Sequence, residues 1–192
     1  MAFPVHALKP RGGELWAVLF ENPSARVALD VYWSAEIRFG PFDHYGEELG
    51  CLLSADWMRI PVRDWRDLSG RVVEGPFDVV QTSFYTVEHD PAVSSRIAFG
   101  PRVGAVFDVQ WSATIRFEEF HERDADPGLK VHAAAALPFS GILIPTDAVR
   151  GTDMTDARAE ELLDGLIDRD RFGRLEHSRN SFGVEQWRLL PE

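Results

Sequence analysis

One stretch of the sequence occurs twice, and this repeat constrains the fold more than any other feature. Residues 27–39 read VALDVYWSAEIRF and residues 105–117 read AVFDVQWSATIRF, at a constant offset of 78. Eight of the thirteen positions are identical, including the tryptophans Trp33 and Trp111. Average composition gives about one match in such a window. We therefore interpret the two stretches as products of an internal duplication.

Both copies alternate between apolar and polar residues, as a β-strand with one buried face does. Every odd-numbered position is apolar, whereas most even-numbered positions are polar or charged. Thirteen extended residues would span roughly 43 Å, which is longer than the usual strand. We expect a bulge at Ser34–Ala35, and at its copy Ser112–Ala113, that lets each strand curl around a core.

The charges of the two copies would match if the strands paired with each other. With Ser34 opposite Ser112 in an antiparallel pair, Asp30 would face Arg116, and the same match would recur at the other end. Facing opposite charges contribute about 0.2–1 kcal/mol each. This register is a hypothesis that the structure can test.

The rest of the chain predicts a mainly β protein of one domain. The repeat halves cover about residues 13–75 and 77–145, and a helix and tail occupy residues 146–192. Further strands are expected at residues 14–20, 52–61, 72–73, 77–87, 93–99 and 184–190, with two more in 129–145. From Thr155, apolar residues at helical spacing up to Ile167 predict an amphipathic helix. The pattern is typical of an antiparallel β-barrel or sandwich whose halves are related by a pseudo-twofold axis.

Composition narrows the classes of partner. The chain has 192 residues and a net charge of -11, which disfavours binding to nucleic-acid phosphates. Lys9 and Lys130 are its only lysines, and Cys51 is its only cysteine. No apolar stretch is long enough to span a membrane as a helix, and no export signal begins the sequence. A cytoplasmic protein without an intrachain disulfide is expected.

Established catalytic motifs are missing from the sequence. It contains no GxSxG, Walker A, GxGxxG, HExxH or paired CxxC pattern. Hydrolase, NTPase and dinucleotide-binding functions therefore have no support, although an enzyme is not excluded. No cofactor is identified. His132 falls within an expected strand and is interpreted as a structural histidine.

The loops after the two repeat stretches are both acidic, and each contains a histidine. His44 and Glu48 follow the first copy, and His121 and Glu122 follow the second. Imidazole and carboxylate groups bind zinc and other transition metals, so these four residues are candidate metal ligands. Their spacing matches no established motif, and solvated acidic loops explain the same composition. Both interpretations stay open.

Four aromatic residues lie on the apolar face of the repeat strands: Trp33, Phe39, Trp111 and Phe117. They would line a ligand cavity if the barrel is hollow, and they would form its core if it is filled. Alternation establishes only that this face is buried. The cavity is therefore one of two possibilities.

Three classes of function remain open. The first is a non-catalytic binding or interaction module that uses its acidic surface to hold a protein partner. The second is a barrel that carries a small apolar ligand. The third is a metal-dependent enzyme with its site at the loops after the repeat strands. Unpaired sheet edges would also permit self-association, so a monomer and a homodimer are both compatible with the sequence.

Overall fold

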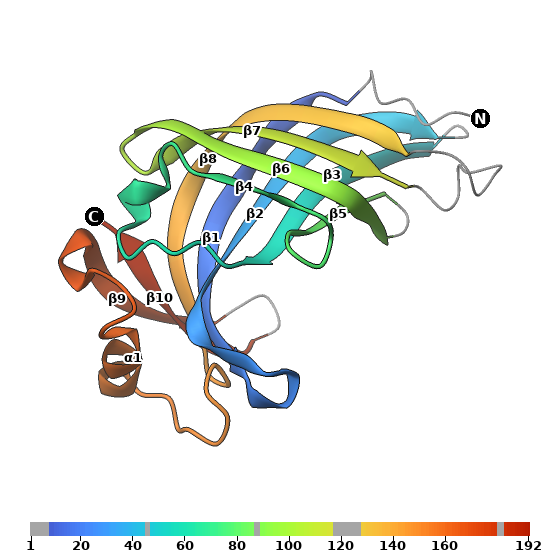
Figure 1. Cartoon of the computed structure of the whole chain (residues 1–192). Helices are drawn as coiled ribbons and strands as arrows, with labels where there is room; N and C mark the ends of the chain where they lie inside the picture. The colour runs from blue at the N-terminus through green and yellow to red at the C-terminus, as the bar shows by residue number, and fades with distance from the viewer. Residues whose placement is uncertain (1–7, 45–46, 87–88, 117–127, 180–182) are drawn as a thin grey trace.

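The computed structural model describes residues 8–44, 47–86, 89–116, 128–179 and 183–192. Its elements, shown in Figure 1, follow in chain order. They are β1 (Pro10–Asn22), the 3-10 turn η2 (Pro23–Ala25), β2 (Val27–His44), β3 (Glu47–Met58), η3 (Trp65–Leu68), β4 (Val72–Gly75), β5 (Gln81–Tyr85), β6 (His89–Val103), β7 (Val106–Ile115), β8 (Leu129–Pro145), α1 (Asp156–Leu163), η4 (Arg169–Arg171), β9 (Phe172–Arg179) and β10 (Glu185–Pro191).

Seven strands close into a barrel. Their order is β1-β2-β3-β5-β6-β7-β8, with antiparallel neighbours throughout, and a parallel pairing of β8 with β1 completes the ring. β4 adds to β6, and the hairpin of β9 and β10 extends the sheet from β8. The predicted mainly β fold with one α-helix is therefore confirmed for the described residues, and the barrel is the correct alternative.

The two repeat strands, β2 and β7, hold equivalent places in two antiparallel meanders, β1-β2-β3 and β6-β7-β8. Their odd-numbered residues point into the barrel, as the alternation predicts: Trp33 is 2% exposed and Trp111 is 1% exposed. The duplication itself stays a prediction.

The proposed pairing of the two repeat strands is wrong. β2 pairs with β1 and β3, and β7 pairs with β6 and β8. Asp30 lies opposite Phe20 and binds Arg59, with 3.1 Å between Oδ2 and Nε. Each copy pairs instead with strands adjacent in sequence, because short connections favour neighbouring elements. The expected irregularity occurs at Ser34, where the pairing with β3 shifts, but Ser112–Ala113 is regularly paired.

Aromatic side chains from different elements pack against one another inside the barrel. The rings of Trp33 and Phe139 lie 5.3 Å apart, and Phe39 lies 5.8 Å from Phe84. At the end of the barrel away from the N-terminus, η3 inserts Trp65, whose ring stacks on Phe139 at 5.6 Å. This end of the barrel is therefore closed by a side chain from a connecting segment.

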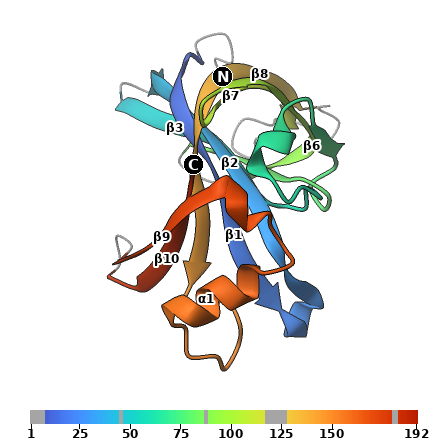
Figure 2. The same ribbon diagram turned by 90° about the vertical axis from the view of Figure 1, so that its left-hand side faces the viewer.

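The C-terminal part of the chain extends the sheet beyond the barrel (Figure 2). α1 covers this extension with the buried residues Ala159, Leu162 and Leu163. Thr155 caps the helix, because its Oγ1 accepts a hydrogen bond from the backbone N–H of Arg158 at 3.2 Å. No helix among the described residues has the length and apolar character needed to cross a membrane.

Several predicted boundaries differ from the structure. The expected strand at residues 77–87 is reduced to β5, and β9 was not predicted. The two strands expected in 129–145 form one strand, β8, which runs from the barrel into the extension. Gly141 lies where this strand meets β10: its φ is +108°, and a Cβ there would lie 2.2 Å from the carbonyl oxygen of Leu189.

Candidate functional site

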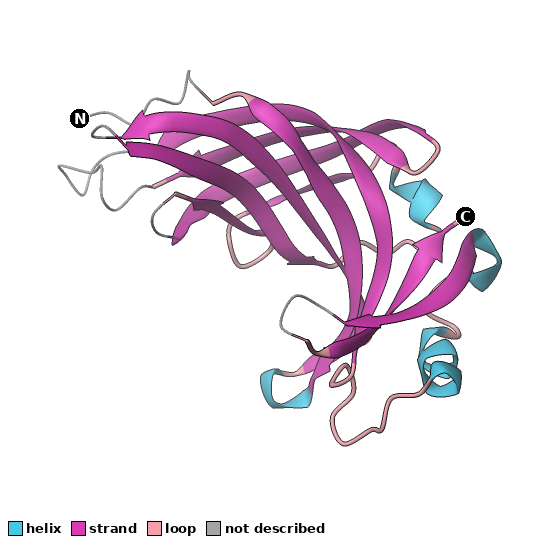
Figure 3. Ribbon diagram, turned by 180° about the vertical axis from the view of Figure 1, so that it is seen from behind, coloured by secondary structure: helices cyan, strands magenta, loops and turns pink. Residues whose placement is uncertain are grey.

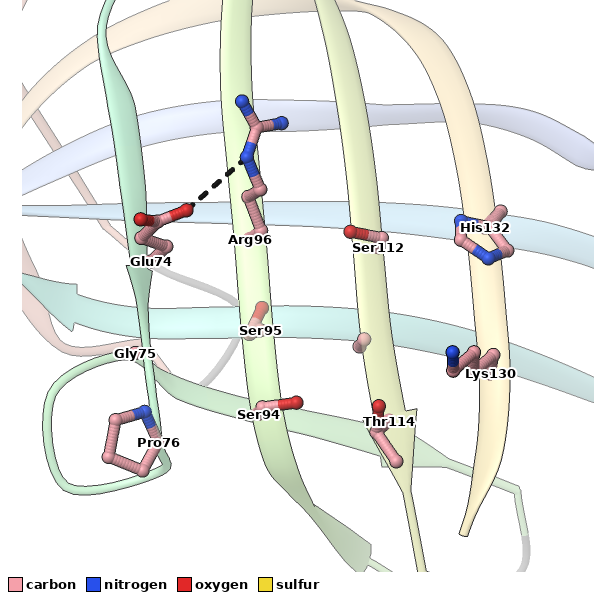
Figure 4. A pocket seen from close by; sticks show the side chains of 11 residues that line it. Glu74, Gly75, Pro76, Ser94, Ser95, Arg96, Ser112, Thr114, Lys130 and His132 are labelled. Atoms are coloured by element: carbon pink, nitrogen blue, oxygen red, sulfur yellow. Dashed lines mark ion pairs between the residues drawn. The ribbon is translucent and has the colours of Figure 1, made fainter. Parts of the chain in front are cut away.

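A groove of about 660 Å³ crosses the outer face of the barrel over β4, β6, β7 and β8 (Figure 4). A neighbouring hollow of about 460 Å³ continues along the strands and shares Arg96, Ser112 and His132 with it. The groove is open to solvent, and most of its lining residues have polar or charged side chains. Its lining comprises Glu74, Gly75, Pro76, Ser94, Ser95, Arg96, Ser112, Ala113, Thr114, Lys130 and His132.

Strand register places the polar residues of the groove in two rows. Glu74, Arg96, Ser112 and His132 are successive cross-strand partners from β4 to β8. Ser94, Thr114 and Lys130 form the second row (Figure 4). Adjacent strands lie about 4.8 Å apart, so the first row spans roughly 14 Å. A ligand that contacts the whole row must lie across the strands.

The alternation of β8 explains why Lys130 and His132 reach the outer face. Val131 and Ala133 point into the barrel and are buried. The residues that alternate with them, Lys130 and His132, are therefore exposed on the outer face. The floor of the groove is low because its central outward-facing positions carry small side chains, namely Ser94, Ser112 and Thr114. Gly75 and Pro76 form the wall where β4 ends.

Charge in the groove differs in sign from charge in the chain as a whole. Arg96 and Lys130 oppose the single carboxylate of Glu74, whereas the whole chain carries -11. Arg96 Nε lies 3.3 Å from Glu74 Oε2, but both side chains are more than half exposed, and such surface pairs contribute only about 0–1 kcal/mol. Within the described part of the chain, Lys130 and His132 form no ion pair.

The groove offers several charged and neutral hydrogen-bond donors, and Glu74 is the one carboxylate among its lining residues. The ammonium group of Lys130 and the guanidinium group of Arg96 carry positive charge, and the hydroxyl groups of Ser94, Ser112 and Thr114 can donate. Carboxylate and phosphate groups are the natural ligands of such donors. Ser112 neighbours His132, but no hydrogen bond joins these two side chains among the described residues, so they are not arranged as nucleophile and base.

The residues predicted to line a cavity lie in the interior. Trp33, Phe39 and Trp111 are buried, and their rings are close to other side chains. Trp111 Nε1 donates to Ser95 Oγ at 3.0 Å. Phe117 lies outside the described residues. The apolar ligand cavity stays a prediction.

Two of the four predicted metal ligands, His44 and Glu48, lie in strands rather than in the expected loop, because β2 extends to His44 and β3 begins at Glu47. His121 and Glu122 lie outside the described residues. His44 ends β2, and the exposed Glu48 is paired with Asp43 across the hairpin. No group of three or more His, Cys, Asp or Glu residues that could hold a metal occurs within the described ranges.

Sequence reasoning missed the groove because its residues come from four strands with long separations. The one usable signal was the polar positions on either side of Val131. His132, which the sequence indicates as a structural histidine, has its side chain exposed on the barrel surface. Comparison of the chain with protein-family models, curated proteins and solved structures finds no match.

Proposed function

We propose that this protein is a non-catalytic binding module that holds a ligand with a carboxylate or phosphate group in the groove over β4, β6, β7 and β8. The single observation that carries the proposal is the position of Lys130. It is one of two lysines in a chain of net charge -11, and it follows His132 along the outer face of β8, in a groove whose lining also includes Arg96 and the hydroxyl groups of Ser94, Ser112 and Thr114.

The size and shape of the groove support a small or extended ligand. Its volume of about 660 Å³ is in the range of small-molecule sites, which is about 300–1,000 Å³. The row from Glu74 to His132 favours an elongated molecule, with its anionic group at Lys130 on the β8 side of the groove. A hydroxyl or amino group on the same ligand would then reach Glu74.

The test measures anion binding by isothermal titration calorimetry at low salt, with citrate and inorganic phosphate as probes. Lys130→Ala is expected to weaken binding at least about tenfold, because a hydrogen bond to a charged group contributes about 1.5–3 kcal/mol. Lys9→Ala is the matched control. It removes the same charge from an exposed residue outside the groove and should leave the affinity unchanged.

Two results would contradict the proposal. One is the absence of saturable binding by either anion to the folded wild-type protein. The other is equal weakening in both lysine variants, which would indicate a response to net charge alone.

A further inference from the structure

Trp57 has a backbone conformation that bulky residues rarely adopt. Its φ is +58°, in the left-handed region. It lies in β3 where the pairing with β2 shifts, so that Asp56 and Trp57 stand opposite Ser34. The backbone N–H of Trp57 donates to Ser34 Oγ at 3.4 Å. Such a conformation persists only where its surroundings hold it, and it is frequent at ligand-binding sites.

The extra residue in β3 places the Trp57 indole on the outside of the barrel. Met58, the next residue, is fully buried, whereas Trp57 is 40% exposed. The indole lies over Phe20, with ring centroids 4.6 Å apart, and its edge approaches Tyr32 at 6.2 Å. A bulge that turns a large aromatic side chain towards solvent stabilises no core.

Other apolar side chains continue this surface along the outer face of β1. Trp16 and Val18 are partly exposed and share the face of Phe20. We call the set the apolar stripe, and it comprises Trp16, Val18, Phe20 and Trp57; Tyr32 is only 8% exposed and packs against the Trp57 ring without adding to the exposed surface. Tryptophan is enriched in the centres of protein interfaces and among the residues that dominate binding. The stripe lies on the barrel wall that faces the viewer in Figure 3, opposite the groove.

The rim of the apolar stripe is acidic. On the same outer face it carries four carboxylates, those of Glu14, Asp30, Glu36 and Asp56, and two guanidinium groups, those of Arg38 and Arg59. Four negative charges against two positive charges leave a net charge of about two negative. Arg38 pairs with Glu36, and Arg59 pairs with Asp30, so among the described residues Glu14 and Asp56 have no arginine partner, although Asp56 Oδ2 accepts a hydrogen bond from Ser54 Oγ at 3.0 Å. This rim complements a cationic ligand.

We propose that the apolar stripe docks a basic segment of a partner protein. An arginine or lysine of that segment places its cation over the Trp57 indole and packs its methylene stem on Phe20. Its neighbouring cations lie at the acidic rim. The site is independent of the groove, because it is on the opposite wall and selects the opposite charge.

The probe is a blocked peptide of alternating arginine and alanine, and its neutral counterpart contains citrulline in place of arginine. Binding to the whole chain is measured by calorimetry at physiological salt. Trp57→Gly leaves the net charge unchanged and removes the indole, and glycine adopts a positive φ freely, so the fold is retained. We expect at least a tenfold loss of affinity. Trp57→Asn, which also tolerates this conformation, should give the same loss.

Val103→Ala is the control, because Val103 is 84% exposed at the end of β6, and β6 does not contribute to the stripe. The affinity of Val103→Ala for the arginine peptide should equal that of the wild type. Equal binding of the arginine peptide by wild type and Trp57→Gly would overturn the proposal, since net charge alone would then attract the peptide. Equal binding of the citrulline peptide would also overturn it. So would a wild-type dimer that Trp57→Gly dissociates, because the occupant would then be a second copy.

Discussion

Ser95 forms hydrogen bonds with two other side chains in the barrel interior. Its Oγ accepts a hydrogen bond from Trp111 Nε1 at 3.0 Å and lies 2.8 Å from Thr82 Oγ1. All three side chains are buried. Trp33, the counterpart of Trp111 in the other copy, has a buried Nε1 that finds no hydrogen-bond partner in the described part of the chain. At offset 78, Ser95 corresponds to Ala17, which has no hydroxyl group to offer.

Ser95→Ala is therefore expected to lower the free energy of unfolding by about 1–3 kcal/mol, because it leaves the Trp111 indole without its acceptor in a buried position. Urea denaturation measures the change. Ser94→Ala, at the exposed neighbouring position, should alter stability by less than about 0.5 kcal/mol. Equal effects of the two substitutions would show that the buried hydrogen bond contributes nothing.

At the same scale, Cys51 is an inert side chain. Burial raises the pKa of its thiol to about 12, so the reactive thiolate is scarce in the folded protein at neutral pH. The thiol is also buried in the core of the barrel, out of reach of solvent.

Among the elements, α1 is attached to the following segment by a two-pronged ion pair. Arg169 Nε lies 2.7 Å from Glu160 Oε2, and Nη2 lies 2.9 Å from Oε1. Arg169 Nη1 also donates to the carbonyl oxygens of Phe172 and Gly173 at the start of β9. One guanidinium group thus joins the helix to the terminal hairpin.

This ion pair makes stability depend on pH in a definite direction. The hydrogen bond from Arg169 lowers the pKa of the Glu160 carboxyl below its usual 4.5. A lowered pKa stabilises the folded state above the unfolded value, and the contribution is lost as pH falls through the folded value. Glu160→Gln should therefore be less stable than wild type at pH 7, and the difference should shrink in acid.

Thermal unfolding of both proteins between pH 7 and pH 3 tests this expectation. Glu161→Gln is the control, because Glu161 is exposed and pairs only with Arg158 on the same helix. A difference between wild type and Glu160→Gln that stays constant across this range would exclude the ionic origin of the effect.

The strands show how far sequence reasoning extends. Alternation predicted the strands β1, β2, β3, β6 and β7. It also predicted the buried face of both repeat strands, because a strand with one buried face has an apolar residue at every second position. The local sequence of a strand does not determine which strands it pairs with or in which register. The hypothesis that Asp30 faces Arg116 was therefore wrong, and the groove, which depends on the pairing of four strands, was missed. The helix ends at Leu163, four residues before the last apolar residue of its pattern, and Gly165 follows with a φ of +80°. Ile167 lies beyond the helix but is buried nonetheless. The apolar spacing therefore predicted correctly that Ile167 is buried, but not that it is helical.

For the whole molecule, Trp65 connects the barrel interior to the C-terminal extension. Its ring stacks on Phe139 inside the barrel, and its Nε1 donates to the carbonyl oxygen of Arg171 at 2.9 Å. The guanidinium group of Arg102 lies 5.0 Å from the ring centroid. The backbone N–H of Asp168 also donates to the carbonyl oxygen of Arg63 at 2.8 Å. The barrel and the extension therefore share one core.

Trp65→Ala is expected to cost about 3–5 kcal/mol of stability, because it leaves a large cavity at the end of the barrel and removes one connection to the extension. Chemical denaturation followed by circular dichroism measures this loss. Trp65→Phe keeps most of the volume and should cost less. Similar losses in both variants would assign the effect to the hydrogen bond with Arg171 instead of the packing.

The parallel pairing of β1 with β8 has a consequence for folding while the chain is being synthesised on the ribosome. Leu15 is paired with Phe139, so 124 residues separate the two sides of the seam. At about 5–20 residues per second, synthesis needs roughly 6–25 s to supply the second side. During that interval one edge of the first strand is bare, and such edges are sites of mispairing between chains. The nascent protein is thus most vulnerable before the seam closes.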